Sequence, residues 1–282
     1  NPVVISNGYR IQFHDAPTES VDLGFIVPQW AHQPSNAELC EFLNMTESEL
    51  PNTIILLPIR KDKVQAMRAQ LFQLSPQLVL FLKKIEKLSV RQLSNKHVVL
   101  KEITVQRYIT PLPQQCDRML ENDCSYSMVR LSSAGQEIAY HVWQQEFPVN
   151  DDREVDHRRH VRSGMVTLAF PLKDDYKDTD IYSFLPTKLT VGFPFIINAD
   201  FLLVSSRDTI RFDSVWNKGI MLCIPDAFIS AFEFLLKSAN VITGFSSSLK
   251  DVYNYIPHKE VHVKEFSLVQ EKILKKIKSE DI

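Results

Sequence analysis

The side chains best suited to bind an anion gather in one short segment of arginines and histidines. Its six basic residues are Arg153, His157, Arg158, Arg159, His160 and Arg162. Such a cluster can attract phosphate, RNA or an acidic partner. Four acidic residues between positions 151 and 156 lower its net charge, and no aromatic residue that could stack on a base lies between positions 148 and 164. We interpret the segment as a solvated, salt-bridged loop and do not expect a nucleic-acid partner.

Histidine pairs raise the question of a metal site. His157 and His160, three residues apart, share a helix face with Asp156 if the segment is helical, but no third soft ligand is near in sequence. His258 and His262 are four apart, yet the proline at position 257 weakens helical geometry there. The sequence predicts no metal site from these histidines.

The cysteines are few and widely spaced, at positions 40, 116, 124 and 223. Secreted chains of this size usually carry denser, paired cysteines, so this usage indicates a reducing compartment, nuclear or cytoplasmic. Cys116 and Cys124 flank an acidic loop without a CxxC partner, and a zinc site is not expected.

Composition sets the broad class. A chain of 282 residues with 44% apolar and 23% charged residues suits about two globular domains. The net charge of -2 gives no overall attraction to nucleic acid or anionic membrane. No apolar run approaches the roughly 18 residues needed to cross a bilayer, so a membrane is not expected as a partner. Only 7 glycines occur, and neither GxGxxG nor GxxxxGK[ST] is present, so the main cradle of any bound nucleotide lies outside this chain.

The first part of the chain reads as strand, helix and strand. Residues 3–13 predict a hairpin around Asn7-Gly8, because this dipeptide accepts positive φ at both turn positions. Residues 53–59 form a continuous apolar run, typical of a strand buried on both faces. Helical spacing starts at Asp62, a candidate N-cap, and a further strand begins near residue 88. We expect the helix to pack back on the sheet.

The remainder reads as a second sheet followed by helices. Its expected strands are 98–108, 127–131, 137–147, 165–170, 181–185 and 193–204. Residues 215–237 predict the longest helix, with Pro225 bending or restarting it. Residues 266–277 predict an amphipathic helix with a lysine-rich face. Such a helix can dock on a membrane or partner, but it more often packs its apolar stripe on its own domain.

Several segments together carry a family resemblance. They are residues 7–13, 24–30, 52–58, 181–187, 193–201, 205–208 and 216–217. In these segments the chain resembles plant NO VEIN-like and sacsin-like proteins, whose ATPase domain belongs to the GHKL superfamily of gyrase, heat-shock chaperones, histidine kinases and MutL. The segments span most of residues 3–236.

The resemblance implies an α+β fold in three parts. Residues 1–92 would form the C-terminal part of a GHKL ATPase-like domain, a mixed sheet with a packed helix. Residues 93–240 would form a chaperone-middle-like α/β domain, and residues 241–282 a linker with an amphipathic C-terminal helix. The family's Glu-Asn helix, Asp-x-Gly-x-Gly loop and glycine-rich lid are absent here. The chain alone is therefore not expected to hydrolyse ATP, and ATP and magnesium are expected only with the missing N-terminal half.

Two residues match family positions that touch nucleotide. Thr53 resembles the threonine that helps to hold adenine, although Asn52 replaces the glycine that commonly precedes it. The other reading is that Thr53 is only a β-branched strand residue.

Arg207 resembles an arginine of the ninety-kilodalton chaperones that lies in a Ser-Arg-Glu turn and reaches the γ-phosphate. Here the turn is Ser206-Arg207-Asp208. A guanidinium offers a planar fork of donors that stabilises charge on phosphate oxygens. The alternative is a surface arginine paired with Asp208 or Asp213.

The leading hypothesis is a chaperone-like ATPase fragment that couples nucleotide state to the packing of a second module and to protein partners or clients. The first alternative is a degenerate scaffold that has lost catalysis, and the second is a self-contained α/β binding module. Superfamily relatives often dimerise when nucleotide closes the lid, which leaves a homodimer open.

Overall fold

The computed structural model describes residues 2–14, 27–94, 96–110, 116, 118–149, 158, 160–172, 181–238 and 249–279. The chain divides into two compact units. The first unit comprises residues 1–74 and 89–103, and the second comprises residues 75–88 and 104–282. The domain boundaries expected at residues 92 and 240 stay predictions.

The first unit is built on a four-stranded antiparallel sheet of order β3-β2-β1-β4. Its strands are β1 (Val3–Ser6), β2 (Tyr9–His14), β3 (Val27–Trp30) and β4 (Thr53–Leu56). The predicted β1–β2 hairpin is confirmed: Val3 pairs with Gln12, and Asn7 and Gly8 both have positive φ, 48° and 84°. Glycine adopts a positive φ without steric strain, and asparagine tolerates the left-handed region. The turn therefore fixes the register of the two strands.

β4 differs from its prediction. It ends at Leu56 and is an edge strand, whereas a strand over 53–59 buried on both faces was expected. Its residues alternate between exposed and half-buried, and Leu57 and Ile59 beyond it are exposed. A continuous apolar run was wrongly read as a central strand, because apolar composition does not tell whether a second layer covers it.

Two helices of eight residues belong to the first unit, α1 (Asn36–Leu43) and α2 (Val64–Leu71). α1 begins with a capping box in which Ser35 and Glu38 satisfy each other's backbone N–H groups. α2 has no side-chain cap: Asp62, the predicted N-cap, instead accepts from Arg60 at 2.8 and 3.1 Å. No α2 residue is buried, so the expected packing of this helix on the sheet is not formed.

The second unit holds most of an eight-stranded sheet of order β11-β10-β12-β9-β8-β7-β6-β5. The strands are β5 (Lys87–Leu93), β6 (Val99–Thr110), β7 (Cys124–Ser133), β8 (Gln136–Pro148), β9 (Ser163–Pro171), β10 (Ile181–Ser183), β11 (Leu185–Pro186) and β12 (Ile196–Ala199). β5 and β6 contribute residues to both units. β10 and β12 run parallel, whereas the pairs from β6 to β9 and β12–β9 are antiparallel.

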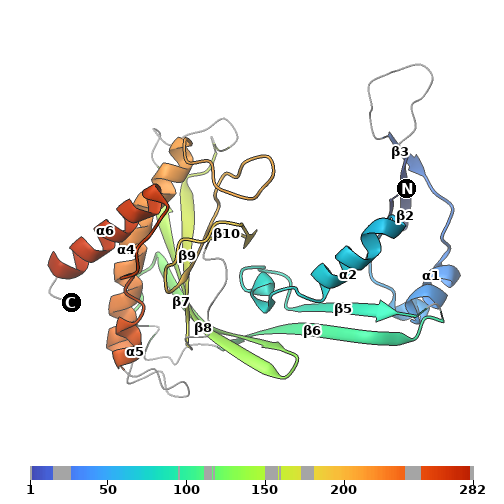
Figure 1. Cartoon of the computed structure of the whole chain (residues 1–282), viewed down its shortest axis with the longest axis horizontal. Coiled ribbons are helices and arrows are strands. Elements are labelled where there is room, and N and C mark those ends of the chain that lie inside the picture. The colour runs from blue at the N-terminus through green and yellow to red at the C-terminus, as the bar shows by residue number, and fades with distance from the viewer. Residues whose placement is uncertain are drawn as a thin grey trace. The chain divides into compact units, whose positions relative to one another are not determined.

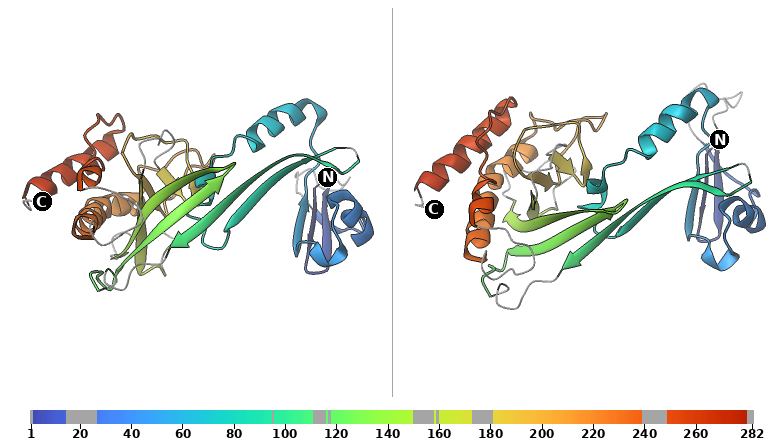
Figure 2. Two further views of the ribbon diagram at one scale, coloured as in Figure 1. Left: turned by 90° about the horizontal axis from the view of Figure 1, so that it is seen from below. Right: turned by 60° about the horizontal axis from the view of Figure 1, so that its bottom comes forward.

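Three helices cover one face of this sheet: α4 (Val215–Ser238), α5 (Leu249–Tyr253) and α6 (Lys264–Ser279) (Figure 1). α4 runs as one helix through Pro225, which was expected to bend or restart it. Figure 2 shows α6 alongside α4. Phe266, Val269 and Ile273 of α6 are buried, which confirms that its apolar stripe packs on its own domain.

α4 also corrects an expectation about membranes. Among the described residues it is the one helix long and apolar enough to cross a bilayer, whereas the sequence was read as holding no such segment. In the structure 14 of its 24 residues are buried in the second unit. Core packing accounts for this apolar composition without a bilayer.

The opposite face of the sheet is covered over part of its area by the 3-10 helix η3 (Pro76–Val79) and the residues that follow. Adjacent residues point to opposite faces: Trp143 joins the helical side, and Val142 joins the side of η3. Two sheets with helices gathered on one face of the larger one make this an α+β fold, as predicted.

His141 is a buried titratable group in the core beneath α4. Its side chain is 2% exposed, and its Nδ1 lies 2.5 Å from the Tyr126 hydroxyl. Burial lowers the pKa of His141 from its usual 6.5 to about 4. The imidazole is therefore neutral in the folded protein at pH 7.

We expect acid to destabilise the second unit through His141. The unfolded chain takes up a proton near pH 6.5 but the folded chain only near 4, so the free energy of unfolding should fall as pH drops between these values. The loss should reach about 3 kcal/mol and level off below pH 4. Thermal melting of wild type and His141→Gln across this range measures it. A variant that loses as much stability as wild type would contradict the assignment.

Candidate functional site

Thr53 stands at the start of edge strand β4 and is exposed. Its hydroxyl lies 2.8 Å from the hydroxyl of Ser6, the residue it pairs with on β1. The two hydroxyls form a small polar pair, and each keeps hydrogen-bonding capacity for an outside group.

Thr53 and Ser6 lie at one end of an exposed apolar sheet face. Residues directly opposite each other in paired strands share a face, so the pairings place Val4, Tyr9, Ile11, Trp30 and Ile55 with them. We call these seven residues the open sheet face. Tyr9 and Trp30 stack at 5.9 Å between ring centroids although they are 61% and 70% exposed, and Ile55 is 60% exposed.

The other face of this sheet is the better covered one. Arg10, on that face, donates from its guanidinium to the Pro34 carbonyl and the Asn36 side chain at the start of α1. Ile5 and Leu39 are the two buried hydrophobic residues among the described parts of the first unit. A unit this size normally buries a much larger core. Among the described residues of the first unit, no buried hydrophobic layer lies over the open sheet face.

A second uncovered apolar region lies within the first unit between α2 and β5. It is a groove of about 600 Å³ whose walls include Met67, Leu71, Phe72, Val90 and Val99. Val64, Met67 and Leu71, whose helical spacing predicted the helix, all line this groove. The groove adds to the apolar area that this unit leaves open.

Arg207 is exposed at the tip of a tight turn in the second unit. The turn is closed by the bridge between Leu203 and Ile210, and the Arg207 N–H donates to the Val204 carbonyl at 2.8 Å. Arg207 has a φ of 59°, in the left-handed region that few non-glycine residues adopt.

The surface ion pairs proposed as the alternative role of Arg207 are taken by other residues. Asp208 pairs with Lys188 at 3.0 Å, and Asp213 pairs with Arg211 at 3.6 Å. Within the described ranges no ion pair is formed by Arg207. The turn thus presents a free guanidinium to solvent, in a different unit from Thr53.

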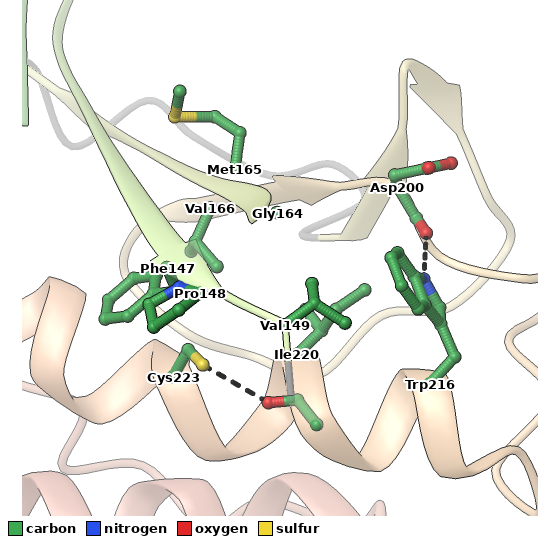
Figure 3. A pocket seen from close by; sticks show the side chains of 11 residues that line it. Phe147, Pro148, Val149, Gly164, Met165, Val166, Asp200, Trp216, Ile220 and Cys223 are labelled. Carbon is green, nitrogen blue, oxygen red and sulfur yellow. Dashed lines mark hydrogen bonds between the residues drawn. The ribbon is translucent and has the colours of Figure 1, made fainter. Parts of the chain in front are cut away.

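Of the basic segment, Arg158, His160 and Arg162 lie within the described residues, and the other three lie outside them. The Arg158 guanidinium is bound to the Asp200 carboxylate, with one contact at 2.7 Å, and lies 5.2 Å from the Trp216 ring centre. Figure 3 shows the Trp216 indole donating to the Asp200 carbonyl, at 2.8 Å. For Arg158 the salt-bridged interpretation is confirmed. The pocket drawn there holds about 30 Å³, room for about one water.

Metal ligands gather at one place in the described part of the chain. Atoms of Glu121, Asp123 and Cys124 lie within 4.8 Å of one another. Burial, with Asp123 and Glu121 adding negative charge, raises the pKa of the Cys124 thiol to about 12. The two carboxylates of this cluster are exposed, and exposed acidic groups commonly lie together without an ion, so the cluster by itself assigns no metal. His258 and His262 are exposed, and His157 lies outside the described residues.

The chain is similar to Protein NO VEIN of Arabidopsis thaliana. The two sequences are 24% identical over 269 residues, which is 90% of this chain and 9% of NO VEIN. No family model matches the chain, and no solved structure matches it. The similarity to NO VEIN supports a NO VEIN-like plant sequence. The GHKL and sacsin-like parts of the resemblance stay predictions.

Sequence reasoning missed the open sheet face. The alternation of Tyr9, Ile11 and Phe13 carried the signal, because it predicts one apolar side of a strand. The sequence does not say whether that side is covered, so exposed Tyr9 and Trp30 could not be distinguished from core aromatics.

We expect the small core of the first unit to appear in hydrogen exchange. Strands with few buried contacts open at low free-energy cost, so amides of β1 and β2 should exchange faster than those of β7 and β8. A factor of at least about ten is expected, equivalent to about 1.4 kcal/mol in local opening. Exchange measured by mass spectrometry on the 282-residue chain reports both sets at once. Equal protection in the two units would refute the claim that the first unit is incomplete.

Proposed function

We propose that this chain is a coupling and interaction segment of a chaperone-like ATPase, not ATP-hydrolysing by itself. The observation that carries the proposal is the open sheet face of the first unit. A sheet with an exposed apolar face, in a unit that has two buried hydrophobic residues among its described parts, gains stability when another protein layer covers that face. In the proposed function that layer belongs to the nucleotide-binding half, and its nucleotide state changes how the face is covered.

Thr53 and Arg207 would be the contacts with nucleotide. Thr53 offers a hydroxyl at the polar end of the open sheet face, where a covering layer would meet it. Arg207 offers a guanidinium that no described carboxylate neutralises. The similarity to NO VEIN spans 90% of this chain but only 9% of NO VEIN. Binding of ATP and magnesium, protein clients, a homodimer and a nuclear or cytoplasmic location are therefore parts of this proposal.

Arg207→Ala in the complete protein tests the proposed role of the guanidinium. Loss of a group that stabilises transition-state charge should lower kcat for ATP hydrolysis by about a hundredfold or more and leave nucleotide affinity nearly unchanged. The matched control is Arg211→Ala, which removes an exposed, paired arginine four residues away. Equal kcat values for the two variants would remove Arg207 from the mechanism.

Thr53→Val tests the proposed adenine contact. Removing one hydroxyl should weaken ATP binding by roughly tenfold, the value of a net hydrogen bond of about 1 kcal/mol or slightly more. Thr53→Ser keeps the hydroxyl and should restore affinity. Equal ATP affinity of Thr53→Val and wild type, measured by titration calorimetry, would show that Thr53 is only a strand residue.

The second candidate function is a scaffold of the same fold without catalysis. Asn52 in the place of glycine and Asp208 in the place of glutamate favour it. The open sheet face serves this function equally, because a scaffold also docks a protein layer. Steady ATP hydrolysis by the complete protein would exclude the scaffold, and its absence would exclude the ATPase.

A further inference from the structure

The sheet face opposite α4 contains a hollow in the second unit that the proposed function does not use. It lies where η3 and the residues after it stop covering the sheet, and it has a volume of about 340 Å³. Small-molecule sites typically begin at about 300 Å³. Its walls mix apolar side chains with polar and charged ones, which is typical of a binding site rather than of a packing defect.

Arg107 of β6 is a buried charged residue that lines the hollow. Its side chain is buried, with 7% exposed. It donates to three carbonyls, of Val79 at 3.3 Å, Leu80 at 3.5 Å and Lys83 at 3.2 Å. Its buried Nε has no acceptor. A guanidinium has five N–H donors, so these long bonds leave it partly unsatisfied.

Arg107 also lacks a neutralising carboxylate among the described residues. Glu86 acts on it only at longer range, partly opposing the lowering of the Arg107 pKa by burial. Asp200 lines the hollow, but its carboxylate is bound to Arg158. Lys83 lines the hollow as well and adds a second positive charge. The hollow is therefore a cationic site without its counter-ion.

Phe184 forms an aromatic wall of the same hollow. It has a φ of 62°, an unusual value for a bulky residue, and the residue as a whole is 45% exposed. Its N–H donates to Asn198 Oδ1 at 2.8 Å, which holds this backbone conformation. Backbone strain that holds an apolar ring in solvent is a feature of ligand sites.

We propose that this hollow binds a small organic anion whose phosphate or carboxylate lies at Arg107 and Lys83 and whose flat apolar body lies against Phe184. Gln144 and Thr167 also line the hollow, and their polar side chains can orient the ligand. Neither Thr53 nor Arg207 lines this hollow, so the proposed site is independent of the proposed function.

Titration calorimetry of the 282-residue chain with phenyl phosphate and with benzoate tests the proposal. At least one of the two probes should bind saturably, and the one that binds identifies the anionic group. Lys83→Gln and Phe184→Gly should each weaken that binding by about tenfold or more. Both side chains reach the surface, and glycine accepts a φ of 62°, so these variants should keep the wild-type melting temperature.

Two neighbours that do not line the hollow serve as controls. Lys84→Gln removes a charge beside Lys83, and Leu185→Ala removes an exposed apolar side chain beside Phe184. Both controls should bind like wild type. The proposal is overturned if neither probe binds saturably at millimolar concentration, or if Lys83→Gln and Phe184→Gly bind as tightly as their controls.

Discussion

The second unit depends on the packing of three phenylalanine rings between its sheet and its longest helix. Phe170 of β9, Phe195 just before β12 and Phe228 of α4 lie 5.2 to 6.1 Å apart, centroid to centroid. All three are almost fully buried. Large aromatic side chains bury more apolar area than any others, so this contact ties strand, loop and helix into one core. The same core contains residues of β10, which Phe184 follows in sequence, and of β12, which precedes the turn of Arg207.

Among the described residues of the first unit, no helix packs on the sheet face that carries Tyr9 and Trp30. Ile5 and Leu39 are buried on its covered side, while Tyr9 and Trp30 stack against each other in solvent. Stacking recovers a fraction of the area that a covering layer would bury. The same alternation of apolar and polar residues therefore builds a core in the second unit and leaves an exposed apolar face among the described residues of the first.

The local structure was largely predictable from the sequence, and the layers were not. Asn7-Gly8 defined the first hairpin, because turn chemistry is a local property, and the strands expected at 98–108, 127–131, 137–147 and 165–170 overlap β6 to β9. β4 was misjudged as a central strand because neighbours distant in sequence decide burial. Of the candidate site, Thr53 and Arg207 came from resemblance alone. Arg107 takes an apolar position in the alternation of β6, between Val105 and Ile109, but only the structure shows that it lines a hollow.

Arg107 and Arg207 illustrate two physically different ways to hold an arginine ready for an anion. Arg107 is desolvated, so its charge is worth more to a ligand but also constrains the fold around it. Arg207 is exposed, and its position is set by the backbone of its turn. Lys188 holds this turn by donating its N–H to the Asp208 carbonyl at 2.8 Å and pairing with the Asp208 carboxylate at 3.0 Å. That clamp occupies the carboxylate of Asp208 and holds the left-handed turn, so no described carboxylate neutralises the Arg207 guanidinium.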